Sequence, residues 1–468
     1  MQHTTLSKLS SDYILKLSSS LCEPEWLSEY RKNSINIYNK LGDEVSPLYN
    51  KYSDASKMDH NQIRLSNKSQ SVIPDFIKNR IHELDNTANI IQIGSNIHQI
   101  YIPNKIKLED LHISSIHEAI KNDENSKINK LFQTIDPKKD KYVALNNAAF
   151  DSGISINVPD NVNINEPIHI ICCLNNNNIS TISRHIINVG ENSNLEIIQE
   201  IYAPESQTQN AYIELLDSTV SSNSKLTFTS LQVMNQKAVN FSTRRNTINV
   251  DGKANYYLGL FGAMLSRYKI NHHLVGSGST VNDYEVIFGD HNQSFDISSN
   301  VHHEKPSTTA KIIEKSILKD QSKSLFKGMI RINEQANKSQ SFLSGRSILL
   351  SKNAKSDAIP SLEILTNDVK ATHSASVSQI DDELIFYIQS RCLTKEDAER
   401  IIIEGFLEPM SRNMSYQARA WIAYLIESKW NNQDLTIHTN EQLKKLVEIE
   451  ETRYNEIETE LEKHYKYR

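Results

Sequence analysis

The sequence is poor in the residues that define several classes of protein. Its 468 residues include only 13 Gly, 11 Pro and 4 Cys. Scarce Gly and Pro exclude collagen-like chains and low-complexity linkers. Cys22 and Cys392 stand alone and Cys172 adjoins Cys173, which matches neither a disulfide framework nor a C-x-x-C zinc motif. This usage favours a reducing compartment, so we expect a cytoplasmic protein.

Long apolar runs and an excess of basic charge are missing as well. The longest apolar stretches are short, such as residues 168–174, whereas a membrane span needs roughly 18–20 apolar residues. The segment from Met1 to Leu21 has no continuous apolar stretch of a secretory signal, although its Ser content leaves an organelle stroma as an alternative location. Lys and Arg number 51 against 57 Asp and Glu, a formal net charge of −6. We therefore predict neither a membrane nor a nucleic-acid partner.

Three zones follow one another along the chain, and the first, residues 1–135, is predicted to be largely helical. Glu23-Pro24-Glu25-Trp26-Leu27 has the Pro and the acidic residues of a helix start. Residues 42–75 are polar and are expected to be irregular. Residues 90–102 alternate like one or two short strands, and residues 111–131 are expected to form another helix.

The second zone, residues 136–385, consists of short alternating apolar runs separated by small polar residues, which is typical of strands with one buried face. Turns start at Gly276, Asp290, Lys305, Asp320 and Glu334, which are nearly evenly spaced, and earlier turns start at positions 190, 221 and 250, at about twice that spacing. Such regularity favours a β-helix, and an antiparallel sandwich is the alternative. Abundant Asn suits stacked coils because it tolerates left-handed turns.

The third zone, residues 386–468, is predicted to be a helical domain. A short helix is expected over residues 381–390. Thr394 opens a further helix with a capping box, and Pro409 is expected to end it. Residues 418, 421, 422 and 425 then form an apolar stripe typical of an amphipathic helix, and Thr439 begins a second capping box.

Few motifs in the sequence indicate chemistry. Phosphate-loop, H-E-x-x-H and G-x-S-x-G motifs are absent, and residues 276–280 are interpreted as a bare turn. In His272-His273 and in His302-His303 the two side chains must point to opposite faces of a strand. One member of each pair could still combine with another coil, and hydrogen-bonded surface His is the simpler interpretation.

The thiols of Cys172 and Cys173 should likewise point to opposite faces. The inward thiol would pack as a small hydrophobic group, and a sulfur-handling role would need an exposed thiol with a lowered pKa. His373 lies between Thr372 and Ser374, whose small side chains would leave its ring accessible. Because a neutral imidazole binds iron or zinc, His373 is a candidate metal ligand, with a structural His as the alternative.

Read together, several ordered motifs resemble the SufB/SufD family of iron–sulfur cluster assembly proteins, and most closely its SufD branch. They extend over most of the chain. The motifs are Glu23-Pro24-Glu25-Trp26-Leu27, Glu166-Pro167-Ile168-His169-Ile170, Ser183-Arg184-His185-Ile186-Ile187-Asn188-Val189, Ala354-Lys355-Ser356-Asp357, Pro360-Ser361-Leu362-Glu363-Ile364, Asn367-Asp368-Val369-Lys370 and Asp382-Glu383-Leu384-Ile385-Phe386-Tyr387.

The resemblance implies a mainly β fold, with a right-handed parallel β-helix core between N-terminal and C-terminal helical regions. It also implies a non-catalytic scaffold subunit. In the family, one SufB, one SufD and two copies of the ATPase SufC form a complex on which nascent clusters assemble. The resemblance therefore implies that the β-helix pairs with a SufB-type subunit and that the C-terminal helices dock a SufC-type ATPase.

Particular residues favour SufD over SufB. The late β-helix segment over residues 342–350 has no Cys where SufB has its sulfur acceptor, whereas Lys370-Ala371-Thr372-His373-Ser374 keeps the His of a K-C-S-H-G-like segment. His373 therefore resembles the SufD interface ligand. No cofactor is expected to stay bound to this chain alone. Any nascent iron–sulfur cluster at the SufB interface would take its thiolates from the partner, because such clusters are bound mainly by thiolates.

Two other functions stay open on the sequence. One is an autonomous, SufB-like homodimeric scaffold that binds a cluster with its own residues. The other is a β-helix enzyme acting on carbohydrate, although the acidic residues of the second zone are scattered rather than clustered. For SufC docking, residues 395–408 and 413–429 are the candidate helices, with Phe406 and Trp421 as anchors because large aromatic side chains dominate interface energies. The alternative is that these helices only pack on each other.

Overall fold

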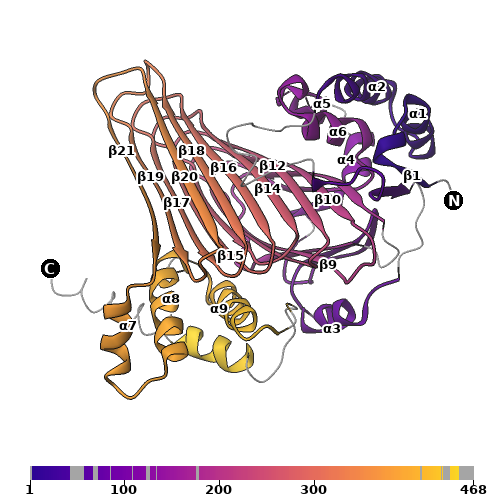
Figure 1. Cartoon of the computed structure of the whole chain (residues 1–468). Helices are drawn as coiled ribbons and strands as arrows, with labels where there is room; N and C mark the ends of the chain where they lie inside the picture. Colours follow the sequence, from indigo (N-terminus) through magenta and orange to yellow (C-terminus); the bar gives the residue numbers. More distant parts are fainter. Residues whose placement is uncertain are drawn as a thin grey trace.

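A computed structural model gives the fold. It describes residues 3–42, 57–66, 72–84, 86–107, 109–122, 127–132, 134–174, 179–411, 414–433, 435 and 443–452. A long β structure of two stacked sheets fills the centre (Figure 1). N-terminal helices lie at one end of it, and C-terminal helices lie beneath one of the two sheets. Within the described residues, no helix is both long and apolar enough to cross a membrane.

The β structure is a parallel solenoid, as predicted. From β6 onward, chain-consecutive strands alternate between a nine-stranded and a ten-stranded sheet. Neighbouring strands within each sheet pair in parallel from β6 and β7 onward. The sandwich alternative is therefore wrong. The shorter of the two turn spacings in the sequence corresponds to one strand and its turn. Two such units make a coil, as when Ser294 pairs with Lys323.

The strands of the nine-stranded sheet are β5 (His112–Ser115), β6 (Ile154–Val158), β8 (Thr181–Val189), β10 (Ala211–Val220), β12 (Val239–Ile248), β14 (Leu265–Leu274), β16 (Ser294–His303), β18 (Lys323–Ile332) and β20 (Lys355–Ile364). Those of the ten-stranded sheet are β3 (Asn89–Ile93), β4 (Asn96–Tyr101), β7 (Ile168–Cys173), β9 (Asn194–Ala203), β11 (Lys225–Met234), β13 (Lys253–Leu260), β15 (Thr280–Gly289), β17 (Thr309–Leu318), β19 (Gln340–Leu349) and β21 (Lys370–Gln379). The strands predicted within residues 90–102 are thus β3 and β4, which pair antiparallel at the start of the ten-stranded sheet.

The turns between coils repeat because one residue in each adopts a left-handed conformation. Asn161, Asn192 and Asn223, one coil apart, have φ of 62°, 55° and 58°, a conformation that Asn tolerates better than most residues. Close stacking also selects glycine. A Cβ on Gly276 would lie 1.9 Å from the backbone nitrogen of Val250 in the preceding coil. Residues 276–280 are therefore a bare turn, as predicted.

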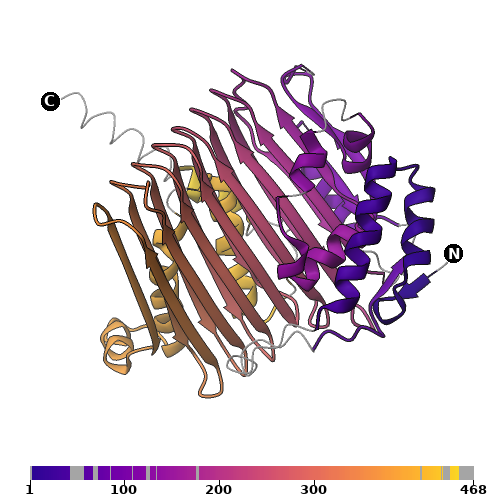
Figure 2. The ribbon, with the colours of Figure 1, turned by 90° about the horizontal axis from the view of Figure 1, so that it is seen from above.

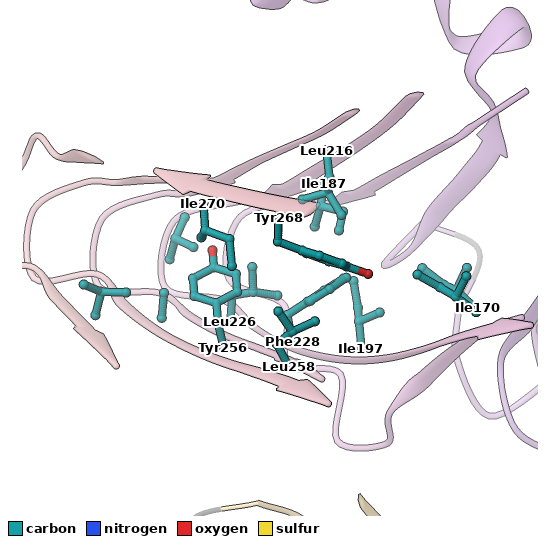
Figure 3. Close-up of a cluster of buried hydrophobic side chains, with 14 of the residues drawn as sticks. Ile170, Ile187, Ile197, Leu216, Leu226, Phe228, Tyr256, Leu258, Tyr268 and Ile270 are labelled. Carbon is teal, nitrogen blue, oxygen red and sulfur yellow. The ribbon is translucent and has the colours of Figure 1, made fainter. Parts of the chain in front are cut away.

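The space between the two sheets is filled by inward-pointing side chains. Phe228, Tyr256, Tyr268 and Ile270 from both sheets contact one another there (Figure 3), and each is at most 5% exposed. Because a strand alternates its side chains between faces, one apolar residue in two suffices to build this core. Burying each such side chain is worth about 1.5–3 kcal/mol.

Apart from residues 75–83, which pack on β9 of the ten-stranded sheet, the N-terminal helices cover the first strands of the nine-stranded sheet and leave its last strands open (Figure 2). Their anchor is Arg31, which donates to both carboxylate oxygens of Glu23 and to the carbonyl oxygens of Ala148 and Phe150. The motif that begins at Glu23 is therefore a buried ion pair as well as a helix start. The helices of this region are α1 (Ser11–Ser20), α2 (Glu25–Lys40), α3 (Asp75–Glu83), α4 (Ile116–Lys121), α5 (Lys127–Phe132) and α6 (Lys141–Ala149), with 3-10 turns at Leu6–Lys8 and Pro137–Lys139.

Two expectations for the N-terminal region were wrong. Residues 111–131 do not form one helix. Strand β5 comes first, and Ser115 then ends the strand and begins α4 through a capping box with Glu118. Part of the stretch predicted to be irregular is ordered, since β2 (Arg64–Ser66) pairs with β1 (His3–Thr5). Residues 43–56 and 67–71 of that stretch lie outside the described residues.

The C-terminal helices α7 (Asp382–Gln389), α8 (Lys395–Ser411) and α9 (Tyr416–Trp430) lie beneath the ten-stranded sheet (Figure 1). The capping contact at Thr394 forms as predicted, because its hydroxyl accepts from the Asp397 amide at 3.1 Å. Pro409 does not end α8, which continues to Ser411 because a proline in the last turn costs only one backbone bond. The predicted capping box at Thr439 lies outside the described residues, and residues 443–452 are helical.

The prediction that α9 is amphipathic is wrong. Side chains on every side of it are buried, including Arg419, Ser428 and Lys429. Lys429 donates to the Phe261 carbonyl oxygen and to Oε1 of Gln293, the latter at 2.7 Å, and so attaches the end of the helix to the solenoid.

Candidate functional site

Within the residues that the structure describes, no segment caps the last coil of the solenoid. In the described part of the chain, β20 and β21 are the final strands of their sheets, and each pairs on one side only. Every residue of β20 and β21 is exposed or half-buried, whereas most residues of the preceding coils are buried. An unpaired strand edge presents free amide and carbonyl groups to another chain. Both edges and the interior of the coil are therefore open at this end.

His373 lies on this last coil. It is in register with Leu343 of β19, a fully buried residue of the solenoid core, so His373 occupies the inward side of β21. Its side chain is nevertheless exposed because no further coil covers it. The neighbouring Ser374 points the other way and bonds the Ser344 hydroxyl at 2.9 Å. The imidazole is accessible at the open end, where a partner would meet it.

A metal at His373 would need ligands from elsewhere. Among the described residues, no three His, Cys, Asp or Glu side chains are arranged to bind a metal ion. Replacement of the Cys expected two residues earlier by Ala371 removes the nearest thiolate of the family pattern. The assignment of His373 as a ligand remains a prediction that depends on a second chain.

The four cysteines divide into two buried and two exposed residues. Cys172 points into the solenoid core, and burial raises the pKa of its thiol to about 12. Cys173 lies on the opposite face, as the alternation predicted, but it is covered there, and burial raises the pKa of its thiol too. Both thiols stay protonated near neutral pH, which disfavours a sulfur-handling role. Cys22 and Cys392 are exposed turn residues with positive φ.

The two histidine pairs also divide between faces. His272 points inward and bonds Asp283 at 2.8 Å, while His303 points inward to Thr308 at 2.7 Å. The outward members, His273 and His302, lie on adjacent strands with ring centroids 4.7 Å apart. Nδ1 of His273 is 3.0 Å from Oε1 of Glu304. Both outward rings are half-buried and packed, which agrees with hydrogen-bonded surface histidines.

The two aromatic residues predicted as docking anchors pack against this chain. Trp421 is 5% exposed, with the Arg80 guanidinium 4.3 Å from its ring. Phe406 is partly buried against the same cluster as Trp421, and the Lys315 ammonium lies 4.7 Å from its ring. Their role in docking remains a prediction, and a partner would reach Trp421 only if α9 moved.

Sequence reasoning missed an exposed aromatic surface on α7. Phe386 is 74% exposed and Tyr387 is 58% exposed, although both belong to a helix in which Ile385 is buried. The Asp382–Tyr387 motif resembles the family, but the spacing of its residues gives no sign that the aromatic side chains face outward. Large exposed aromatic side chains are unusual on a monomer surface and typical of contact sites.

Comparison with known proteins adds to this geometry. The family model "SUF system FeS cluster assembly, SufBD core domain" matches residues 172–406, from β7 to α8. An iron–sulfur cluster assembly SufBD family protein of Staphylococcus saprophyticus is 25% identical over 424 residues, which cover 87% of this chain and 90% of the relative. Relatives of the same description from Staphylococcus epidermidis and Staphylococcus aureus are each 23% identical over 422 residues, again 87% of this chain and 90% of the relative. The chain therefore belongs to the SufBD family of iron–sulfur cluster assembly proteins.

Proposed function

We propose that this chain is a SufD-type, non-catalytic scaffold subunit. In this proposal its last coil pairs with a SufB-type subunit, and its C-terminal helices dock a SufC-type ATPase. The observation that supports it most is the uncapped end of the solenoid with His373 exposed on it. The proposed location is the cytoplasm, and no stable cofactor on the isolated chain is part of the proposal.

The open coil favours pairing with another β-helix over other partners. A second solenoid end would offer strand edges of the same length and would cover the exposed inner side of β21. Exposed Ile364 and Val377, at 40% and 43%, would be buried by such a contact. Each buried aliphatic side chain would then contribute about 1.5–3 kcal/mol before the cost of association.

The chemistry of the site favours a ligand role shared between two chains. His373 can supply one nitrogen to a cluster, but the nearby coils of the solenoid have no thiol, since Cys172 and Cys173 are buried in earlier coils. Iron–sulfur clusters take mainly thiolates, with occasional His ligands. A SufB-type partner would therefore supply the thiolates, and the cluster would be transient cargo of the interface.

For docking of the ATPase, the exposed aromatic pair on α7 is a stronger candidate than Phe406 or Trp421. A Phe386→Asp variant should keep the fold, because the side chain is 74% exposed, and should weaken SufC binding. The matched control is Val250→Asp at a turn of the solenoid, an apolar residue that is 46% exposed and lies outside the C-terminal helices. Equal binding by wild type and Phe386→Asp would remove α7 from the docking surface.

The proposal is tested by co-expression with a SufB-type and a SufC-type protein, followed by size and stoichiometry in solution. A His373→Ala variant in that complex should keep the assembly and lower the yield of cluster. An unchanged yield would reject the ligand role of His373 alone, whereas failure of the wild type to join the complex would reject the SufD assignment.

The autonomous homodimer is the second candidate, because the same open coil could pair with a second copy of this chain. Exposed Cys392 and Cys22 are the thiols that such a scaffold would have to use. It predicts iron and sulfide on protein purified alone without oxygen, and their loss in a Cys22→Ser, Cys392→Ser double variant.

A further inference from the structure

Two glutamates meet inside the solenoid, on β15 and β17, and β19 separates β17 from the last strand, β21. Glu285 of β15 and Glu314 of β17 are directly in register on adjacent parallel strands, and both side chains are fully buried. They lie on the inward face of their strands, together with Val281, Ile287 and Ile312, which belong to the interior apolar cluster. In-register residues of adjacent strands are about 5 Å apart. The two carboxyl groups are therefore close neighbours in an apolar interior.

No positive charge in the described interior neutralises this pair. The charge of Arg244 acts on Glu285, but less than burial and the charge of Asp283 do, and Arg244 is engaged by Glu214 through bonds of 3.0 and 3.1 Å. On β14 the facing group is His272, which bonds Asp283 of β15 at 2.8 Å. That third carboxyl group adds negative charge beside Glu285 rather than removing it.

The carboxyl oxygens of Glu285 and Glu314 also receive too few hydrogen bonds to stabilise two ionised carboxylates. From β16, the Ser299 hydroxyl donates to Oε1 of Glu285, while Oε2 of Glu285 has no partner. Neither oxygen of Glu314 has a hydrogen bond of good geometry to a described residue. Beyond Glu314, β19 contributes Gly345 at the paired position. The Ser316 hydroxyl and the Arg346 backbone amide lie near the carboxyl group and lower its pKa, but burial outweighs both. A buried carboxylate that lacks both a cation and donors is strongly disfavoured.

We propose that Glu285 and Glu314 are both protonated at neutral pH and act as a pH-sensitive clasp between two strands in the later coils of the solenoid. Burial raises the pKa of Glu314 to about 8. Burial, and then the charge of Asp283, raise the pKa of Glu285 as well. With protons bound, the two groups are neutral and the adjacent strands stay together. When the protons are lost, two like charges face each other at close range and push β15 and β17 apart.

The two strands that carry the clasp also contact helix α8 on their outer face. Lys315 follows Glu314 and points to the opposite, outer face, where its ammonium group donates to the Phe406 carbonyl oxygen of α8. Val286 follows Glu285 and packs in the apolar cluster that contains Ile403 and Leu407 of α8. The same two strands therefore present the carboxyl groups inward and support α8 outward. Loss of protons should loosen α8 before the rest of the solenoid.

The sign of the pH effect follows from the raised pKa. The folded protein binds more protons than the unfolded chain between the unfolded value of about 4.3 and the raised folded value. Stability from the clasp is therefore complete below about pH 4.3 and is lost as the pH rises toward about 8. Glu→Gln variants mimic the neutral form and keep its shape, so they should lack this loss.

The test compares wild type with Glu285→Gln and Glu314→Gln variants of the full chain. Hydrogen-exchange rates of the α8 and β17 amides are corrected for intrinsic exchange and followed between about pH 5 and 7.5. In wild type these corrected rates should rise with pH more steeply than in Glu314→Gln, by up to roughly tenfold per pH unit. Glu334→Gln, at an exposed turn glutamate, is the matched control and should behave like wild type.

A second readout does not depend on stability. Wild type at pH 7 should show the infrared carbonyl band of a protonated carboxylic acid, and each glutamine variant should weaken it. A wild-type spectrum without that band would overturn the proposal, even if a variant failed to fold. Identical pH profiles of exchange for wild type and both variants would overturn it as well.

Discussion

Replacement of Glu23 by Gln should destabilise the N-terminal helices, because it removes the negative charge and replaces one of the two oxygens that accept from Arg31 by an NH2 group. The Glu23 carboxylate is 2% exposed and receives two bonds from Arg31, which is itself fully buried. Burial alone would raise the pKa of Glu23. The contact with His117, whose Nδ1 lies 3.5 Å from Oε1 of Glu23, and the charge of Arg31 outweigh that effect and lower the pKa from 4.5 to about 2.

The magnitude follows from that shift. At about 1.36 kcal/mol per pKa unit, the lowered value corresponds to about 3 kcal/mol at pH 7. Removal of one partner from a buried ion pair typically costs about 3–5 kcal/mol, which agrees. Because the folded pKa lies below the unfolded one, this stability is present above about pH 4.3 and is lost as the pH falls toward about 2.

Hydrogen exchange of amides in α2 and α6 measures the effect where it arises, since these helices are joined by Arg31. The Glu23→Gln variant should exchange roughly a hundredfold faster at pH 7, for a difference of about 3 kcal/mol. The difference from wild type should shrink at the acid end. A Glu29→Gln variant, exposed on the same helix, is the control. Equal exchange in wild type and Glu23→Gln would refute the reasoning.

Other predictions follow from single contacts. A Gly276→Ala variant should be destabilised by several kcal/mol, as judged by urea unfolding, because its Cβ would overlap the Val250 backbone. An unchanged urea midpoint would show that neighbouring turns can move apart to make room for the methyl group. A thiol reagent should label the folded chain at Cys22 and Cys392 only, and all four cysteines after denaturation. Labelling of Cys172 or Cys173 in the folded chain as fast as Cys22 and Cys392 would contradict a closed core. The Phe386→Asp variant should bind a SufC-type ATPase at least roughly tenfold more weakly than wild type while its circular dichroism is unchanged.

The coil period was predictable because it depends on local turn chemistry. Asn192 and Asn223 occupy the same turn position one coil apart, and their left-handed conformations mark the repeat in the sequence. Choosing between solenoid and sandwich was not possible from that spacing, because both place strands at short intervals. Only the parallel pairing of alternate strands decides it.

Features that depend on contacts between distant segments could not be predicted. The apolar stripe of α9 predicted one buried face, but sheet and helices together bury Arg419 and Lys429 as well. The exposure of Phe386 depends on how α7 leaves the solenoid. Glu285 and Glu314 lie one coil apart in the sequence, but their inward direction becomes clear only once the register is known.

For the candidate site, the sequence identified His373 but not its setting. The residue types around it predicted an accessible ring, whereas the structure shows why it is accessible, since β21 is the last strand of its sheet. Trp421 and Phe406 were chosen as anchors for their size, and size also made them good core residues.

The central claim is tested most directly by co-expressing this chain with a SufB-type and a SufC-type protein and measuring the mass of the purified complex. We expect one copy each of this chain and the SufB-type subunit with two copies of the ATPase. A homodimer of this chain that binds iron and sulfide and ignores both partners would contradict it.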